Sequence, residues 1–267
     1  MSAASCSLPR RPSTLLLDCC KFALLLALLV WLLARGAEAL GYNWQWYQIP
    51  RYLGRFEDGV FLPGPLLDGL WVTLRITALG LLLAPCLGLS AALLLLSGSP
   101  LGRLLARGYV ELIRNTPLLI QLFFASFVMA PILNLSSEAA AVLALSLFEG
   151  AYATEIIRAG ITSIPVGQWE AAKSLGLSLP RTYWHVILPQ ALRRVLPPLA
   201  GQAVSLIKDS ALVSAIAIAD LTMQGQIIVA RTFLAFEVWF TVAAIYLALT
   251  LTLSLLVARL DKRLRLV

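Results

Sequence analysis

The stretch Ile76–Leu96 reads ITALGLLLAPCLGLSAALLLL, 21 residues without a charged side chain. A helix needs about 20 mostly apolar residues to cross the hydrocarbon core of a bilayer. Val238–Ala258 is a second uncharged run of the same length. These two stretches predict an all-α, polytopic membrane protein.

Three further windows are long enough for a span: Pro117–Leu133, Ala139–Ile157 and Pro197–Ala219. A weaker one, Phe22–Ala34, precedes them all. The sequence therefore predicts five core transmembrane helices and one extra N-terminal helix. We expect residues 1–64 to hold that first helix and an outer interfacial stretch, and residues 65–267 to form the transmembrane domain.

The N-terminal window has two interpretations. A basic start, a short apolar stretch and Ala37-Glu38-Ala39 are compatible with a cleaved signal peptide. The sequence favours an uncleaved span with a cytoplasmic N-terminus. Both interpretations leave residue 41 on the outer side, so the topology of the rest is the same.

The composition supports a membrane protein. Hydrophobic residues make up 60% of the chain and charged residues 13%, against roughly 25% charged residues in an ordinary soluble domain. The mean hydropathy is +0.84. A disordered chain and a soluble nucleic-acid-binding domain are excluded, although the formal net charge is +7.

The basic residues are distributed unevenly between the ends of the predicted spans. Four lie on one side: Arg35, Arg51, Arg55 and Arg231. Those on the other side are Arg10, Arg11, Lys21, Arg103, Arg107, Arg114, Arg158, Lys173, Arg181, Arg193, Arg194, Arg259, Lys262, Arg263 and Arg265. Cytoplasmic loops carry the excess of Lys and Arg, so the larger group, with the C-terminus, is predicted to be cytoplasmic.

Motifs of enzymes are missing from the sequence. The single histidine, His185, excludes an H-E-x-x-H zinc helix, and without a Gly-Lys pair there is no P-loop for ATP. The four cysteines (Cys6, Cys19, Cys20 and Cys86) lack metal-ligand spacing. We expect no catalytic residue, no metal site and no cofactor on this chain.

The longest predicted cytoplasmic loop, about residues 160–196, has its own pattern. Ile164–Gly176 reads IPVGQWEAAKSLG, and Pro180 follows closely. Glycine just past a helix end and proline just inside the next helix are the usual punctuation. The loop is therefore predicted to hold a short helix ended by Gly176, a turn, and a second helix that begins near Pro180.

The loop resembles the EAA loop of binding-protein-dependent ABC importer permeases. Glu170-Ala171-Ala172, Gly176 and Leu188-Pro189 fall at the spacing of that family, with Val186 in place of its isoleucine. Other stretches narrow the resemblance to the polar amino acid branch: ELIRNTPLLIQL (111–122), AYATEIIR (151–158), GQWE (167–170) and KDSALVS (208–214). The resemblance covers about residues 65–265.

The resemblance implies a type I ABC importer permease in the bacterial inner membrane. A periplasmic amino acid-binding protein would deliver the substrate to a pair of permeases, either two copies or two paralogues. Two cytoplasmic ATPase subunits, which hold the ATP and Mg²⁺, would grip the EAA loops and drive alternating access. The implied coupling residues are Glu170, Ala171, Ala172, Gly176, Leu188 and Pro189.

Three charged residues lie near the centres of predicted spans: Glu149, Lys208 and Asp209. An ionised group there costs at least about 2.5–3.5 kcal/mol and needs a partner or a wet cavity. One hypothesis is that Lys208 binds the carboxylate of a zwitterionic amino acid, and Glu149 or Asp209 its ammonium. The alternative is a permanent ion pair of Lys208 with one of the acids.

Asp209-Ser210 could also cap a half-helix that begins at mid-span.

Two further questions stay open. Gly80, Ala84, Gly88 and Ala92 form a stripe of small residues that favours close helix packing, but the neighbouring helix could belong to this chain or to a second copy.

The alternative function is a secondary transporter or channel for small polar solutes that acts without an ATPase. That alternative leaves the EAA-like loop unexplained.

Overall fold

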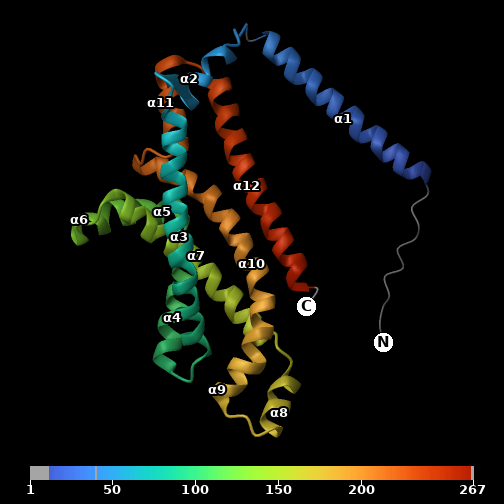
Figure 1. Cartoon of the computed structure of the whole chain (residues 1–267), viewed down its shortest axis with the longest axis vertical. Coiled ribbons are helices and arrows are strands. Elements are labelled where there is room, and N and C mark those ends of the chain that lie inside the picture. The colour runs from blue at the N-terminus through green and yellow to red at the C-terminus, as the bar shows by residue number, and fades with distance from the viewer. Residues whose placement is uncertain (1–11, 40, 266–267) are drawn as a thin grey trace. The chain divides into compact units, whose positions relative to one another are not determined.

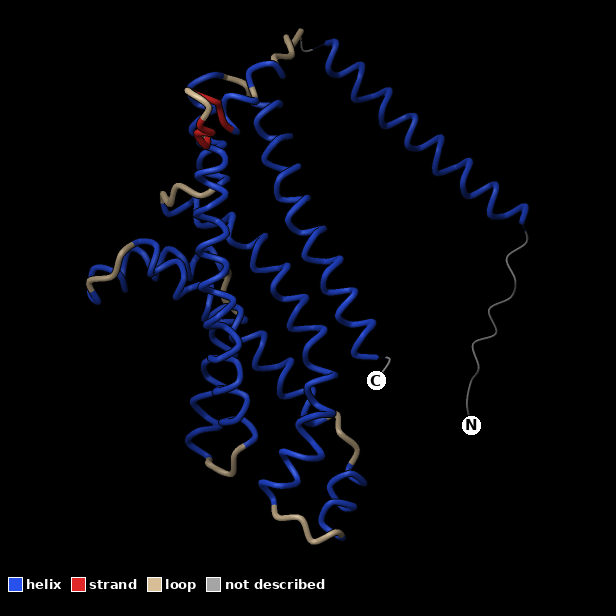
Figure 2. The backbone as a smooth tube through the Cα atoms, viewed as in Figure 1, coloured by secondary structure: helices blue, strands red, loops and turns tan. Residues whose placement is uncertain are grey.

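The computed structural model describes residues 12–39 and 41–265, which are mainly helical (Figures 1 and 2). Cys6, Arg10 and Arg11 lie outside the described residues. The chain divides into two units, Met1–Gln45 and Trp46–Val267. The first unit consists mostly of α1 (Pro12–Ala39), whose apolar part is Cys20–Leu32. The weak N-terminal window is therefore helical.

The second unit holds everything that bears on function. Its elements are η1 (Trp46–Gln48), α2 (Pro50–Leu53), β1 (Gly54–Glu57), β2 (Val60–Pro63), α3 (Pro65–Leu96), α4 (Pro100–Arg114), α5 (Leu118–Phe124), η2 (Ala125–Met129), α6 (Ala130–Leu133), α7 (Ser137–Thr162), α8 (Val166–Ser174), α9 (Leu179–Thr182), η3 (Tyr183–Ile187), α10 (Leu188–Asp209), η4 (Ser210–Ile216), α11 (Leu221–Thr232) and α12 (Ala235–Arg265).

The predicted all-α, polytopic class is confirmed. Among the described residues, four helices are long and apolar enough to cross a membrane: Pro65–Leu96, Ser137–Thr162, Leu179–Ile216 and Ala235–Arg259. Pro100–Arg114 and Leu118–Leu133 give a fifth span if the bent pair is counted as one. The sequence did not predict the two antiparallel strands, which pair Gly54 with Pro63 through Glu57 with Val60 at one end of the unit (Figure 2).

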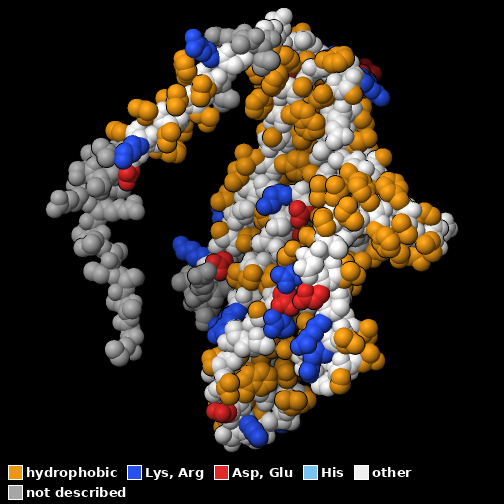
Figure 3. Space-filling model, turned by 180° about the vertical axis from the view of Figure 1, so that it is seen from behind, with side chains coloured by type: hydrophobic (Ala, Val, Ile, Leu, Met, Phe, Trp, Pro, Cys, Tyr) orange, Lys and Arg blue, Asp and Glu red, His pale blue; other side chains and the backbone are white. Residues whose placement is uncertain are grey.

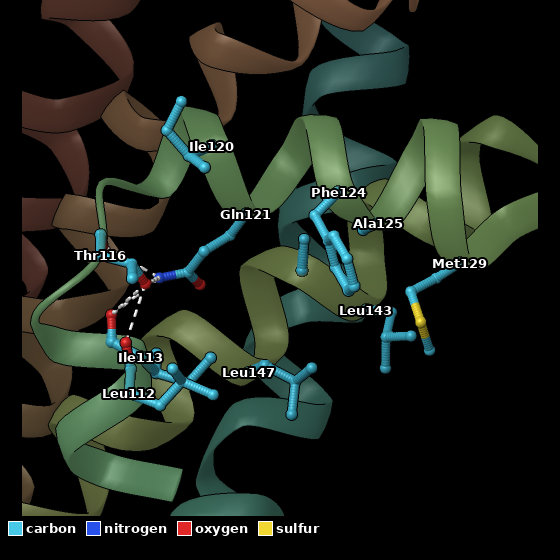
Figure 4. Close-up of a pocket in the computed structure, with 11 residues that line it drawn as sticks. Leu112, Ile113, Thr116, Ile120, Gln121, Phe124, Ala125, Met129, Leu143 and Leu147 are labelled. Atoms are coloured by element: carbon cyan, nitrogen blue, oxygen red, sulfur yellow. Dashed lines mark hydrogen bonds between the residues drawn. The ribbon is translucent and has the colours of Figure 1, made fainter.

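The expected straight span Pro117–Leu133 is corrected by this bend. The chain turns by 107° between α4 and α5, because Pro117 has no N–H to continue the helix. The Gln121 side chain fastens the corner: its Nε2 donates to the carbonyl oxygen of Ile113 at 2.7 Å and to Thr116 Oγ1 at 2.8 Å (Figure 4). The α5–α6 arm therefore leaves the bundle sideways (Figure 1).

The expected continuous span Pro197–Ala219 also differs. Helix α10 ends at Asp209, a 3₁₀ segment runs over Ser210–Ile216, and Ala217 takes a left-handed φ of 61°. The Ser210 hydroxyl donates backwards to the carbonyl oxygen of Ile207 at 2.7 Å. The sequence located a break here, but Asp209-Ser210 closes one helix instead of capping the start of another.

The stripe of small residues on α3 packs against α7 of the same chain. A Cβ added at Gly88 would lie 2.6 Å from the Cβ of Ala153 and 3.1 Å from the carbonyl oxygen of Gly150. Ala84 and Ala92 are buried on the same side of α3. The question that the sequence left open is thus answered within this chain. The backbones of α3 and α7 approach each other closely along the stripe of small residues.

Residues 46–64, assigned from the sequence to the N-terminal segment, pack with the second unit. Ile49 is buried in one cluster with Leu66, Leu221 and Leu234, and the Gly64 N–H donates to the carbonyl oxygen of Leu53 at 2.8 Å. They close the end of the bundle opposite the α8–α9 hairpin (Figure 1).

We predict that Gly88→Ala destabilises the unit by about 1–3 kcal/mol, because the new methyl group would overpack the α3–α7 contact. Gly108→Ala is the matched control, since a Cβ at that helical position on α4 meets no atom within 4 Å. The control should be neutral or gain about 0.5–1 kcal/mol from helix propensity. Thermal unfolding of the purified protein in detergent measures both. Equal melting temperatures would contradict the close packing.

Candidate functional site

Glu149 lies in the middle of α7 and is buried, with 4% of its surface exposed. Its Oε2 has no hydrogen-bond partner among the described residues. The carboxylate borders a small cavity between α3, α7 and α10, which it shares with Pro85, Gln202 and Leu206. A buried carboxylate oxygen without a partner is costly, so it requires a water, a proton or a ligand.

Asp209 lies close enough to Glu149 for the two carboxylates to interact electrostatically. It is half-buried at the end of α10, whereas the neighbouring Lys208 is exposed. Among the described residues, no ion pair within 4.0 Å joins Lys208 to either acid. The structure thus brings Glu149 and Asp209 into one region but does not form the permanent ion pair that was the alternative.

The cavity beside Glu149 measures only about 20 Å³. This is room for about one water molecule and too little for an amino acid. A solute could reach Glu149 only if α10 moved relative to α3 and α7. Proline residues interrupt the hydrogen-bond ladders of two of these helices, at Pro85 in α3 and at Pro197 and Pro198 in α10, and bending is easiest at such positions.

The predicted helix–turn–helix of the long loop is present as α8 and α9, at the end of the unit where α4 begins (Figure 1). Gly176 has φ +70°, and its N–H donates to the carbonyl oxygen of Lys173 at 2.9 Å. Leu177 N–H donates to the carbonyl oxygen of Ala172 at 3.1 Å, so the turn satisfies the last carbonyl groups of α8.

The implied coupling residues divide into two groups. Glu170, Ala171 and Gly176 are exposed on the hairpin, whereas Ala172 is buried, with 2% of its surface exposed. Leu188 and Pro189 stand apart from the hairpin tip, at the start of α10. Pro189 cannot donate to the helix ladder, and the preceding turn Tyr183–Ile187 widens to a π-helix.

Several residues that brace the hairpin were not predicted as site residues. The rings of Trp169 and Tyr183 meet edge to face, with centroids 5.1 Å apart. Gln190 Nε2 donates to Gln168 Oε1 at 3.1 Å, and one Arg194 guanidinium nitrogen donates to the carbonyl oxygen of Ser163 at 2.6 Å. These contacts join residues 14, 22 and 31 positions apart, which no local pattern indicates.

Two ion pairs of the described residues involve α7. Arg158 and Glu155, three residues apart on α7, form an ion pair at 2.6 Å. Arg75 pairs with Glu138 at the start of α7. Within the described residues, no group of three or more His, Cys, Asp and Glu could hold a metal ion.

The bundle of apolar helices is that of a polytopic membrane protein, and its two candidate sites are the buried Glu149 carboxylate and the exposed α8 hairpin. Residues 84–266 match the family of the binding-protein-dependent transport system inner membrane component. This chain belongs to that family, and the resemblance drawn from the EAA loop is confirmed.

Similar proteins agree with this assignment. The glutamine transport system permease protein GlnP of Escherichia coli (strain K12) is 40% identical over 203 residues, which are 75% of this chain and 93% of GlnP. The L-cystine transport system permease protein TcyB of Bacillus subtilis (strain 168) is 41% identical over 204 residues, 75% of this chain and 87% of TcyB. A crystal structure of an amino acid ABC transporter with histidines superposes with a TM-score of 0.71 at 40% identity, covering 74% of this chain and 94% of that one.

We predict that Gly176→Ala loosens the α8 hairpin, because a side chain in the left-handed region costs about 1–2 kcal/mol. Hydrogen exchange at the Leu177 amide should become about five- to thirtyfold faster. Gly167→Ala is the matched control, since this glycine of α8 also has open space around it but no positive φ. An unchanged Leu177 amide in Gly176→Ala would contradict the strained turn.

Proposed function

We propose that this chain is the membrane-spanning permease subunit of an ATP-driven ABC importer for a polar amino acid. The observation that carries the proposal is the family match, which includes both the bundle around Glu149 and the exposed α8 hairpin. The relatives named for glutamine and cystine support the substrate class. The chain itself is a transport subunit and not an enzyme.

The α8 hairpin is the proposed docking element for the cytoplasmic ATPase. Glu170 and Ala171 are exposed on it, so they are available to a groove on a partner. Trp169 and Gln168 fasten it to the segment that leads directly into α10. A force on α8 would therefore reach α10, whose far end carries Asp209. ATP and Mg²⁺ belong to the ATPase and not to this chain.

The proposed substrate cavity lies around Glu149, Asp209 and Lys208. A zwitterionic amino acid needs an anion for its ammonium and a cation for its carboxylate. Glu149 supplies an oxygen without a partner, Asp209 a second carboxylate, and Lys208 an exposed ammonium outside any ion pair of the described residues. Since the cavity beside Glu149 measures only about 20 Å³, alternating access would have to enlarge it and open it on one side at a time.

The remaining partners follow from this topology. We propose an inner-membrane location in which residues 160–196 and the C-terminus are cytoplasmic and the β1–β2 end meets a periplasmic amino acid-binding protein. The α5–α6 arm exposes Ile120, Phe124, Phe127 and Ile132, and an apolar surface of this kind suits a second permease copy or a paralogous subunit within the lipid membrane.

Glu170→Arg is expected to abolish ATP-coupled uptake, because the reversed charge would disrupt ATPase docking. Proteoliposomes with the ATPase, the binding protein and a panel of labelled amino acids measure uptake, and co-purification measures assembly. Glu57→Arg is the control for co-purification with the ATPase, which it should leave intact, since it reverses an exposed acid on β1 at the opposite end. Uptake that needs no ATP and is insensitive to Glu170→Arg would instead favour a secondary transporter or channel.

Glu149→Gln is expected to raise the KM for uptake at least tenfold, because one charge-assisted hydrogen bond is worth about 1.5–3 kcal/mol. Glu138→Gln makes the same change at the start of α7, where the carboxylate pairs with Arg75, and should leave KM unchanged. A normal KM and rate in Glu149→Gln would eliminate its role in substrate binding.

A further inference from the structure

A charged pocket of about 540 Å³ opens between α4 and α7 where α3 ends. Its charged lining residues are Arg103, Arg107, Glu111, Arg114, Glu155 and Arg158. Figure 3 shows acidic and basic side chains gathered on a face that is otherwise largely apolar. Helix α4, which supplies most of the charged lining, lies toward the α8 end of the unit (Figure 1), and neither the Glu149 cavity nor the hairpin accounts for the pocket.

Three charged residues of α4 face this pocket from one side of the helix. Arg107, Glu111 and Arg114 follow at intervals of four and three residues, so their side chains are neighbours on the helix surface. All three are exposed. The pocket therefore presents two guanidinium groups on either side of a carboxylate.

The other arginines of the pocket are already engaged. Arg103 donates to the carbonyl oxygen of Ser97 at 3.0 Å, and Arg158 is paired with Glu155. In the described part of the chain, by contrast, no acceptor within hydrogen-bond distance is found for Arg107, and Arg114 only lies over the ring of Tyr152 at 5.1 Å. The N–H donors of Arg107 and Arg114 thus remain available to a ligand.

We propose that this pocket is a second amino acid site, which holds the substrate after it leaves Glu149. Arg107 and Arg114 bind the α-carboxylate, because guanidinium groups match carboxylates in shape and charge. Glu111 binds the α-ammonium; Asn115 occupies only its Oε2, at 2.9 Å. The inference rests on the proposed function, since it places this site on the route of the same substrate.

The position of the pocket supports this order of sites. Glu149, Tyr152 and Glu155 follow at three-residue steps along α7, so Glu155 lies about 9 Å from Glu149 along the helix axis. The direction from Glu149 to Glu155 along α7 leads toward the end of the unit that carries α8. The carboxylate of Glu111 between the two arginines favours a zwitterion over an anionic lipid headgroup, which the arginines would attract but Glu111 would repel.

Equilibrium dialysis of labelled L-glutamine against the permease–ATPase complex in nanodiscs, without the amino acid-binding protein, tests this proposal without requiring transport. In the Glu149→Gln background, where the first site is weakened, binding should persist. Adding Arg107→Gln should weaken the remaining binding about tenfold or more. The matched control, Arg75→Gln, removes a guanidinium outside the pocket, where it pairs with Glu138, and should leave the binding unchanged.

The chemistry of the site gives a second control. Unlabelled 4-aminobutanamide, which lacks the carboxylate of glutamine, should not compete. Absence of residual binding, equal effects of Arg75→Gln and Arg107→Gln, or competition by the amide would each overturn the proposal. So would phospholipid that co-purifies with the wild type and is lost in Arg107→Gln, since the pocket would then be a lipid site. A failure of the proposed function is distinguished from these outcomes by the proteoliposome assay, in which the wild-type importer would then take up no amino acid.

Discussion

The close approach of α3 and α7 is the packing interaction on which the rest of the structure depends. At Gly88 the two backbones come so near that a single added carbon would touch Ala153 and Gly150. In a bilayer the lipid offers apolar side chains the same environment as a neighbouring helix, so association relies on close van der Waals contact. Small residues along α3 supply that contact, and they set the position of α7 and of Glu149 on it.

This packing explains how a carboxylate can be held inside an apolar bundle. Glu149 projects from α7 at the level where α3 carries Pro85 and α10 carries Gln202. The surrounding helices exclude bulk water, and the nearby Asp209 adds a second acidic group. An arrangement of this kind is unfavourable for stability alone, which is consistent with a functional role in an importer permease.

The hairpin and the bundle are linked through one continuous segment. Trp169 and Gln168 hold α8 against η3 and α10, and Gly160 lets α7 approach α10 so closely that an added Cβ would lie 2.1 Å from Val195. Helix α10 thus contacts the hairpin at one end and the Glu149 region at the other. This continuity is the basis for the proposal that a displacement of α8 reaches the region of Glu149 and Asp209.

Much of this architecture could be predicted from apolar runs and local motifs. Uninterrupted stretches such as Ile76–Leu96 predict spanning helices, and Gly176 with Pro180 predicts the hairpin, because these signals act over a few residues. The 107° corner depends on Gln121 reaching back to Ile113, and the ion pair of Arg75 with Glu138 joins residues that are 63 positions apart. The Arg107 pocket likewise requires α4 and α7 to meet, which only the folded chain specifies.

The central claim is that an ATPase engages the exposed tip of α8. A photoreactive side chain at Ala171 would test it most directly in cells that co-express this chain with its ATPase and its binding protein. The claim predicts a covalent adduct between position 171 and the ATPase subunit, and no such adduct from Phe61 on β2 at the opposite end. An importer that transports its amino acid while position 171 forms no adduct with the ATPase would contradict it.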